Sequence, residues 1–443
     1  MAQSAIILPE TDAPTLPVSN ARRWLTKATF ALIDQGLISG SNFVMGVLLA
    51  RWLGAEQYGA YALAFAIFIL LSLVYQSLLL EPMSVFGPSA YAHRLREYTG
   101  TLIWVHGAIA LATFLVMGAA ALSMAALHKF GGLPSALLGA AVAAPCVLLF
   151  WLARRAYYLK LTPKLAAIGA VLYSVLMFGS LALLHHQHLM SPLVAFLVMA
   201  LAALATSGYL LARFRPSFKA REGAPTLPEV TRENWTYGKW ALASSIFMWV
   251  PWNIFYTLVA SFSGIGSAGQ LRALLNFALP IAQTYGAISL LFLPHAACEL
   301  DKNGWSGVSR VSTRITLCFA AGGLCYWALV SLFRVRILSL LYAGQYADVA
   351  GLIPLIGLAS LFWGAAQGPA IALRANKTPS SVFVMYFVAA IAAVASGVPL
   401  TLRFGLAGAC SAMLIASAAA WITGVYCTRK RTSPPTMAVQ EAA

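Results

Sequence analysis

Residues 48–61 read LLARWLGAEQYGAY, and a related turn, LVASFSGIGSAGQL, follows at residues 258–271. In each copy an apolar stretch ends in a glycine-containing turn, and the matched positions are 210 residues apart. These positions are Ala50, Gly54 and Gly59 in the first copy and Ala260, Gly264 and Gly269 in the second. A turn that recurs in this way indicates two copies of one structural unit.

Two further matches occur in the same order along the chain, at offsets of 216 and 217 residues. They are Thr162-Pro163 with Thr378-Pro379, and Thr206 and Tyr209 with Thr423 and Tyr426. Because the order is kept and the offset is nearly constant, the repeat covers both halves of the chain.

The composition is that of a membrane protein. Of the 443 residues 60% are hydrophobic and only 9% are charged, whereas soluble domains carry about 25% charged residues. Apolar runs of the length that a helix needs to cross the hydrocarbon core occur twelve times. The predicted spans are 28–50, 58–80, 99–126, 134–153, 164–184, 192–212, 237–260, 271–293, 311–333, 350–372, 380–401 and 404–427.

The basic residues predict the orientation of these spans. If both chain ends lie on one side, 23 of the 29 Lys and Arg residues fall on that side and 6 on the other. Basic residues near span ends favour the cytoplasm, so we expect an even number of spans with both termini cytoplasmic. This topology also explains the net charge of +16, and we expect no nucleic-acid partner.

The predicted organisation has five parts and no separate soluble domain. Two lobes of six helices, residues 28–212 and 237–427, are joined by a basic cytoplasmic linker, residues 213–236. Residues 1–27 and 428–443 are predicted to be cytoplasmic tails. Six is an even number, so the lobes are parallel repeats related by an axis along the membrane normal. The predicted fold is therefore an all-α membrane protein with twelve transmembrane helices around a central cavity, which alternating access would open to each side in turn.

Polar residues inside the predicted spans are the candidate substrate contacts, because they are costly in lipid. Arg272, Asn276 and Gln283 are spaced by 4 and 7 residues and would share one stripe of the eighth span. Arg272 is predicted either to face an anion in the cavity or to extend to the membrane surface as an anchor.

The first span carries a carboxylate, Asp34, with Asn42 near the same face. An isolated carboxylate in a span could couple transport to an ion. The alternative is a packing role, in which Asp34 pairs with a hydroxyl or an arginine of a neighbouring helix.

Asn253 in the seventh span and Gln367 in the tenth complete the set of cavity candidates. Asn253 lies among aromatic residues that could stack on sugars, although most of the 12 tryptophans are expected in interfacial belts. Pro251 and Pro280 predict kinks in the seventh and eighth spans.

Other chemistry is sparse in the sequence. The six cysteines have no CxxC spacing, and a phosphate-binding G-x-x-x-x-G-K-[ST] stretch is missing. The cluster His185, His186 and His188 is expected to be a wetted loop rather than a metal site. The sequence therefore predicts no enzyme activity, no metal and no cofactor.

Four stretches carry a resemblance to a known family: LARWLGAEQYGAYALA (49–64), AGQLRALLNFALPIAQTYGAISLLFLP (268–294), ILSLLYAGQYADVAGLIPLIGLA (337–359) and ALRANKT (372–378). They resemble the signatures of bacterial polysaccharide transporters, or O-antigen flippases, of the multidrug, oligosaccharidyl-lipid and polysaccharide (MOP) exporter superfamily. The resemblance implies a flippase in the inner membrane that moves an undecaprenyl-pyrophosphate-linked oligosaccharide to the periplasmic leaflet, for exopolysaccharide or O-antigen assembly. Membrane lipids and polysaccharide polymerase or export proteins are the implied partners.

The chain departs from the family pattern at Leu271, where an aromatic residue commonly precedes the arginine. It also has two spans fewer than the lipid II flippase branch usually has. Two alternatives stay open: an ion-coupled multidrug antiporter of the same superfamily that uses Asp34, and a membrane glycosyl polymerase or ligase, which the short outer loops disfavour.

Overall fold

A computed structural model describes residues 18–88, 90–127, 131–218, 226–376 and 379–430. Within these ranges the regular structure is helical. The first half contains α1 (Val18–Trp52), α2 (Ala55–Tyr75), a π-helical turn η1 (Gln76–Leu80), α3 (Glu81–Phe86), a short 3-10 turn η2 (Ala92–Arg94), α4 (Leu95–Ala126), α5 (Leu133–Leu159), α6 (Pro163–His186) and α7 (Pro192–Phe214). The second half contains α8 (Leu227–Ser263), α9 (Ile265–Leu275), α10 (Ala278–Leu332), α11 (Arg334–Tyr342), a 3-10 turn η3 (Ala347–Leu352), α12 (Ile353–Ala375) and α13 (Pro379–Arg429).

Ten helical segments within the described ranges are long and apolar enough to cross a membrane. Two helices are longer than a single membrane crossing requires, α10 with 55 residues and α13 with 51. Both turn at a glycine with positive φ. The turns are at Gly304 (φ 60°) and Gly405 (φ 55°). Gly405 lies at the start of the predicted span 404–427, directly after the span 380–401, so α13 contains both spans with a turn between them.

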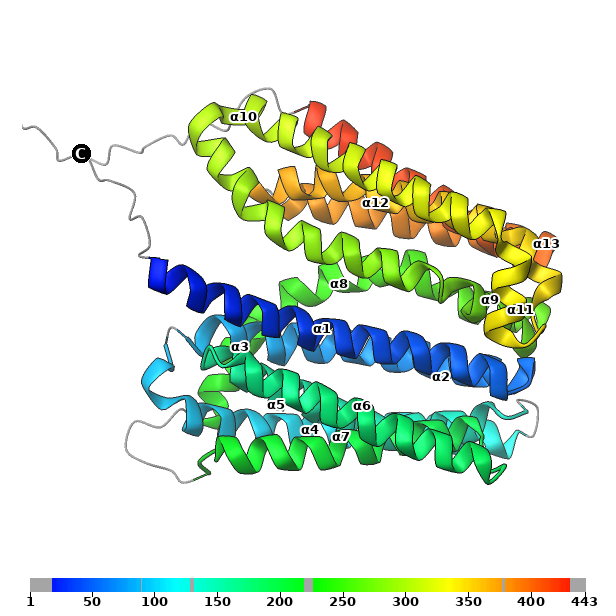
Figure 1. The fold of residues 1–443 in the computed structure, drawn as a ribbon, viewed down its shortest axis with the longest axis horizontal. Coiled ribbons are helices and arrows are strands. Elements are labelled where there is room, and N and C mark those ends of the chain that lie inside the picture. Colours follow the sequence, from blue (N-terminus) through cyan, green and yellow to red (C-terminus); the bar gives the residue numbers. More distant parts are fainter. Residues whose placement is uncertain (1–17, 89, 128–130, 219–225, 377–378, 431–443) are drawn as a thin grey trace, which may run out of the picture.

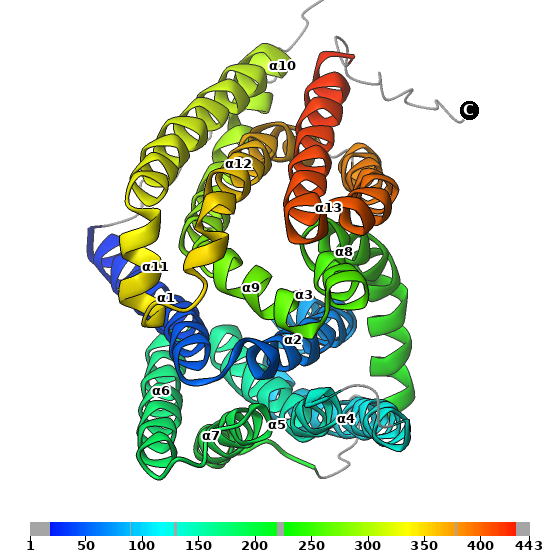
Figure 2. The same ribbon diagram turned by 90° about the vertical axis from the view of Figure 1, so that its right-hand side faces the viewer.

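The helices form two groups that lie side by side (Figure 1), α1 to α7 in the first group and α8 to α13 in the second. The described chain begins and ends at the same end of the molecule, at Val18 and Lys430, which we call the terminal end. The opposite end, where α2, α9 and α11 lie, is the far end. Figure 2 views the molecule from the far end and shows both groups along the helix axes.

Small residues bring the helices of the first group together. Gly139 of α5 has no space for a side chain, because a Cβ there would stand 3.0 Å from the Cβ of Phe196 in α7. Ala136, Ala140 and Ala144 of α5 are completely buried. Small residues of this kind allow the close packing that holds membrane helices together in lipid.

The two groups meet at the far end through the repeated turns. Gly59 of α2 and Gly269 of α9 face each other, and we call this contact the glycine crossing. A methyl group on Gly59 would overlap the carbonyl oxygen of Ile265, and one on Gly269 would overlap that of Ala55. The two copies of the recurring turn therefore pack directly against each other.

The structure corrects the predicted linker. Helix α8 begins at Leu227, so residues 227–236 are helical rather than linker. Thr226 and Glu229 form a capping box that starts the helix, and the hydrogen bonds from Thr226 lower the pKa of Glu229. Tyr91 then donates a hydrogen bond of 2.8 Å to Glu233, which attaches this early part of α8 to the first group.

The predicted tails are shorter than expected or lie outside the described residues. Helix α1 already begins at Val18, before the predicted start at residue 28. Residues 1–17 and 431–443 lie outside the described residues.

The glycine crossing predicts that alanine substitution of two glycines in α9 lowers the stability of the protein by different amounts. Gly269→Ala should weaken the contact between α2 and α9 by about 1–3 kcal/mol, because the backbones must separate. Gly266→Ala is the matched control, since its Cβ would stand 3.9 Å from both the Cβ of Ala55 and the backbone nitrogen of Glu56, an ordinary contact distance. Thermal unfolding of the purified variants measures the difference. Equal midpoints for the two variants would contradict the close contact.

Candidate functional site

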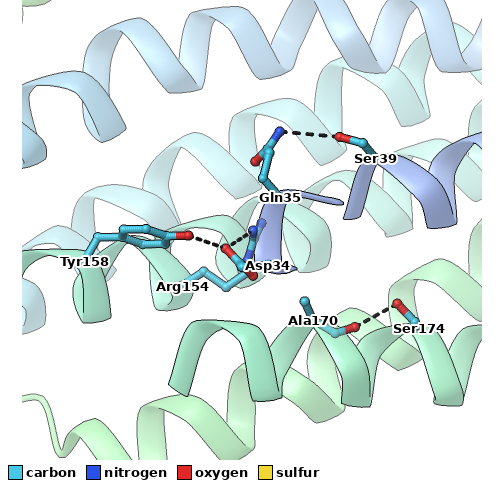
Figure 3. Close-up of polar contacts among 7 residues, drawn as sticks. All are labelled: Asp34, Gln35, Ser39, Arg154, Tyr158, Ala170 and Ser174. Carbon is cyan, nitrogen blue, oxygen red and sulfur yellow. Dashed lines mark hydrogen bonds and ion pairs between the residues drawn. The ribbon is translucent and has the colours of Figure 1, made fainter. Parts of the chain in front are cut away.

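Asp34 is the centre of a buried polar cluster in the first group (Figure 3). The Nε of Arg154 donates to its Oδ1 at 3.0 Å, and Nη2 of the same guanidinium donates to Oδ2 at 2.5 Å. Tyr158 donates a third hydrogen bond to Oδ2 at 2.6 Å. The Asp34 side chain has no exposed surface, and that of Arg154 is 11% exposed. This bidentate geometry is the strongest arrangement for an arginine and a carboxylate.

A second polar contact within the first group joins α1 to α6. Ser41 and Ser174 share a hydrogen bond of 2.7 Å, and Ser174 also donates to the carbonyl oxygen of Ala170 (Figure 3). Asn42 lines a small cavity of about 30 Å³ together with aromatic residues such as Phe150 and Tyr173. Asn42 thus faces the interior of the first group.

The expectation that Asp34 is an isolated carboxylate is wrong. Arg154 and Tyr158 lie near the end of α5, where basic residues were expected only to mark the cytoplasmic side. The packing of α5 near α1 brings residues 120 positions apart into contact, and no local pattern encodes that pairing. The structure places Asp34 in a paired, hydrogen-bonded environment, as the alternative interpretation expected.

Arg272 lies on α9 near the far end, close to the aromatic side chains of both groups. Its guanidinium carbon stands 4.7 Å from the centre of the Phe65 ring in α2, a cation–π distance. Nη1 donates a long hydrogen bond of 3.4 Å to the Tyr256 hydroxyl of α8. Its Nε is buried and has no hydrogen-bond partner among the described residues.

Asn276 is buried to 1% exposure and bridges the two groups. Its Nδ2 donates to the hydroxyl of Tyr58 in α2 at 3.0 Å and to that of Tyr342 in α11 at 3.3 Å. Tyr342 in turn donates to the carbonyl oxygen of Ala273 at 2.9 Å. The side chain packs on Gly46 of α1, where a Cβ would stand 3.0 Å from Asn276 Oδ1. Asn276 therefore holds the far end together in this structure.

Gln283 does not lie on one face with Arg272 and Asn276, contrary to the prediction. The helix is interrupted at Asn276 and Phe277, and Pro280 is the third residue of α10, which begins at Ala278. Gln283 is exposed, whereas Asn276 is buried. The predicted kink at Pro280 explains the difference, because it changes the face that each turn presents.

Asn253 and Gln367 lie next to two tryptophans that contact each other. Trp252 of α8 and Trp363 of α12 form an edge-to-face pair with ring centres 5.8 Å apart. Asn253 follows Trp252 and donates to the Trp249 carbonyl, while Gln367 donates to the Trp363 carbonyl. Both amides are partly exposed, and the indole nitrogen of Trp252 is buried without a partner in the described residues.

Sequence reasoning missed the partners of the charged residues. Arg154 and Tyr158 were not candidates, and neither were Phe65, Tyr256 and Tyr342. Aromatic residues are common in membrane helices, so only their position beside a buried charge distinguishes them, and that position requires the fold.

The described residues hold no group of three His, Cys, Asp or Glu side chains that could bind a metal ion. In the histidine cluster, His185 stacks on Trp52 with ring centres 4.1 Å apart.

No family model and no curated protein matches this sequence. Among solved structures, an inward-facing multidrug resistance MATE family transporter of the MOP superfamily superimposes with a TM-score of 0.77 at 12% identity, over 92% of this chain and 97% of that one. The chain has the fold of the MOP superfamily transporters. The lipid II flippase MurJ in an inward closed conformation gives a TM-score of 0.65 at 10% identity, over 91% of this chain and 87% of that one. A MOP superfamily transporter from Pyrococcus furiosus, described by a reversed polarity of its binding pocket, gives 0.66 at 13% identity, over 93% and 95%.

The Asp34 cluster predicts that its charges depend on each other for stability. Arg154→Met should cost about 3–5 kcal/mol, because it leaves a buried carboxylate without its cation. The double variant Asp34→Asn, Arg154→Met should recover most of this loss, since neither charge remains. Unfolding of the purified proteins measures both values.

Arg213→Met serves as the control for the loss of an arginine, because Arg213 is exposed on α7. It should change stability by less than about 0.5 kcal/mol. A double variant as unstable as Arg154→Met alone would refute the pairing.

Proposed function

We propose that this protein is a flippase that moves an undecaprenyl-pyrophosphate-linked oligosaccharide across the bacterial inner membrane by alternating access. In this proposal twelve helices cross the membrane as two parallel six-helix lobes, α1–α7 and α8–α13, with both termini in the cytoplasm. The product would pass to polysaccharide polymerase and export proteins for exopolysaccharide or O-antigen assembly.

The difference in pairing between Arg272 and Asp34 is the observation that carries the proposal. Arg272 has no carboxylate partner, and the ion pair found within the described residues is that of Asp34 with Arg154. Arg272 is partly buried, and a guanidinium without a carboxylate partner is costly to remove from water, so its presence points to function. Its five N–H donors match a phosphate in geometry and charge. A pyrophosphate would supply the missing negative charge.

The carboxylate that a cation exporter would need is already paired within the protein. Arg154 neutralises Asp34, and Tyr158 takes a further position on the same oxygen. A cationic drug would have to displace both partners to reach it. The described interior therefore favours an anionic substrate over a cationic one.

The second group offers a surface suited to sugars. Trp252 and Trp363 contact each other edge to face, and the partly exposed amides Asn253 and Gln367 lie beside them. Aromatic rings can pack on the apolar faces of sugar rings, while amides donate to and accept from hydroxyl groups. We propose that this patch contacts the oligosaccharide.

The contact between the groups at the far end supports alternating access. The glycine crossing and the Asn276 bridge join α1, α2, α9 and α11 there. In the proposed topology this end is periplasmic, so the present arrangement would be closed to the periplasm. Release of the substrate would require this contact to separate.

An ion-coupled multidrug antiporter is the second candidate function. It is favoured by the fold similarity to a MATE family transporter and by the buried Asp34 on α1. The two functions differ in their response to Asp34→Asn. Drug resistance lost with surface polysaccharide intact would support the antiporter and contradict the flippase.

Replacement of Arg272 tests the flippase directly. In a strain that lacks the gene, Arg272→Gln should restore surface polysaccharide at least tenfold less than the wild-type protein, since one lost charge-assisted interaction costs about 1.5–3 kcal/mol. Lipid-linked oligosaccharide should accumulate in the inner leaflet. Arg403→Gln, which removes an exposed charge on α13, should restore wild-type levels.

Two results would overturn the proposal. One is a normal polysaccharide profile in the deletion strain. The other is full complementation by Arg272→Gln at wild-type abundance in the membrane.

A further inference from the structure

A second cavity lies in the second group, outside the contact between the two groups. Its volume is about 250 Å³, and its walls come from α10, α12 and the last part of α13. Both α10 and α13 pack on α12, which forms the floor through Pro369 and Ala372. Figure 2 shows α10 and the end of α13 on the side of the molecule away from α4 and α7.

The cavity lies at the terminal end, where the proposed topology would place the cytoplasmic membrane surface. Its α13 wall runs from Trp421 to Arg429, the last residue of that helix, a rise of about 12 Å. Trp305 of α10 also lines it. Tryptophan and arginine at a helix end are typical of the interface between headgroups and acyl chains.

The lining of the cavity includes several hydrogen-bond donors. The indole N–H of Trp421 is buried and has no partner among the described residues. Ser309 and Ser312 of α10 line the same space, and within the described part of the chain their hydroxyls donate no hydrogen bond. Arg429 supplies a positive charge, and the lining contains no carboxylate. Unpaired donors with one cation and no anion match a phosphate group.

Apolar side chains line the cavity as well. They include Leu317 of α10, and Val425 of α13, which lies between Trp421 and Arg429. A free phosphate ion would leave this apolar part of the cavity unfilled, whereas a lipid would place its phosphate among the donors and its chain against these side chains.

We propose that this cavity binds the phosphate headgroup of an anionic membrane lipid in the leaflet at the terminal end. Arg429 and the Trp421 indole hold the phosphate, and the serines of α10 complete its hydrogen bonds. The site is separate from Arg272 and Asp34, so it adds a lipid contact that the proposed transport cycle does not require.

Native mass spectrometry of the full-length protein with bound lipids tests this site. The wild-type protein should retain phosphatidylglycerol in preference to phosphatidylcholine. Arg429→Gln should weaken phosphatidylglycerol binding about tenfold, through the loss of a charge-assisted hydrogen bond. Trp421→Phe, which keeps a ring but removes the N–H donor, should weaken it about threefold.

Lys430→Gln is the matched control. Lys430 is the next residue and is exposed, but it does not line the cavity, so its loss should leave lipid retention unchanged. No preference for phosphatidylglycerol, or an equal loss in Lys430→Gln and Arg429→Gln, would overturn the proposal. Size-exclusion profiles like that of the wild type establish that the variants are folded.

Competition identifies the source of the phosphate. Displacement of phosphatidylglycerol by undecaprenyl phosphate, dependent on Arg429, would support the site and assign it to a polyprenyl lipid. Failure of undecaprenyl phosphate to compete would support it as a phospholipid site. Displacement by millimolar inorganic phosphate would contradict a lipid site.

Discussion

The close approach of two glycines at the far end determines how the two halves of the molecule meet. Neither Gly59 nor Gly269 can carry a side chain without overlap with the opposite backbone. Because α9 lies so near α2, Arg272 reaches the Phe65 ring and Asn276 reaches the Tyr58 hydroxyl. The same contact that joins the groups therefore positions the main polar candidates.

Asp34, which is buried, and Arg272, which is partly buried, have different surroundings, and the difference is the basis of the proposed function. The carboxylate of Asp34 receives three hydrogen bonds within the first group. The guanidinium of Arg272 has an aromatic ring, one long hydrogen bond and an unsatisfied Nε. A ligand of opposite charge can stabilise a group that the protein leaves incompletely paired, because it offsets the cost of removing that group from water. The proposed pyrophosphate substrate would provide it.

Much of the fold follows from sequence periodicity, because every membrane-crossing helix must satisfy its own backbone and bury an apolar run. The repeat of residues 48–61 at 258–271 likewise identified the two turns that meet in the structure. The partner of Asp34 did not follow, since Arg154 approaches it only through helix packing. The prediction that Gln283 shares a face with Arg272 and Asn276 was also wrong, because the helix is interrupted at Asn276 and Phe277.

A reversible cross-link across the far end tests the central claim most directly. The Ala55 Cβ and a Cβ on Gly266 would be 3.9 Å apart, within the range of disulfides. In a functional background without the natural cysteines, the pair Ala55→Cys, Gly266→Cys should form a disulfide on oxidation, and proteoliposomes should then stop translocating lipid-linked oligosaccharide until a reductant is added. The single-cysteine variants should be insensitive to oxidation. Translocation by the cross-linked protein at the rate of the reduced form would contradict the account.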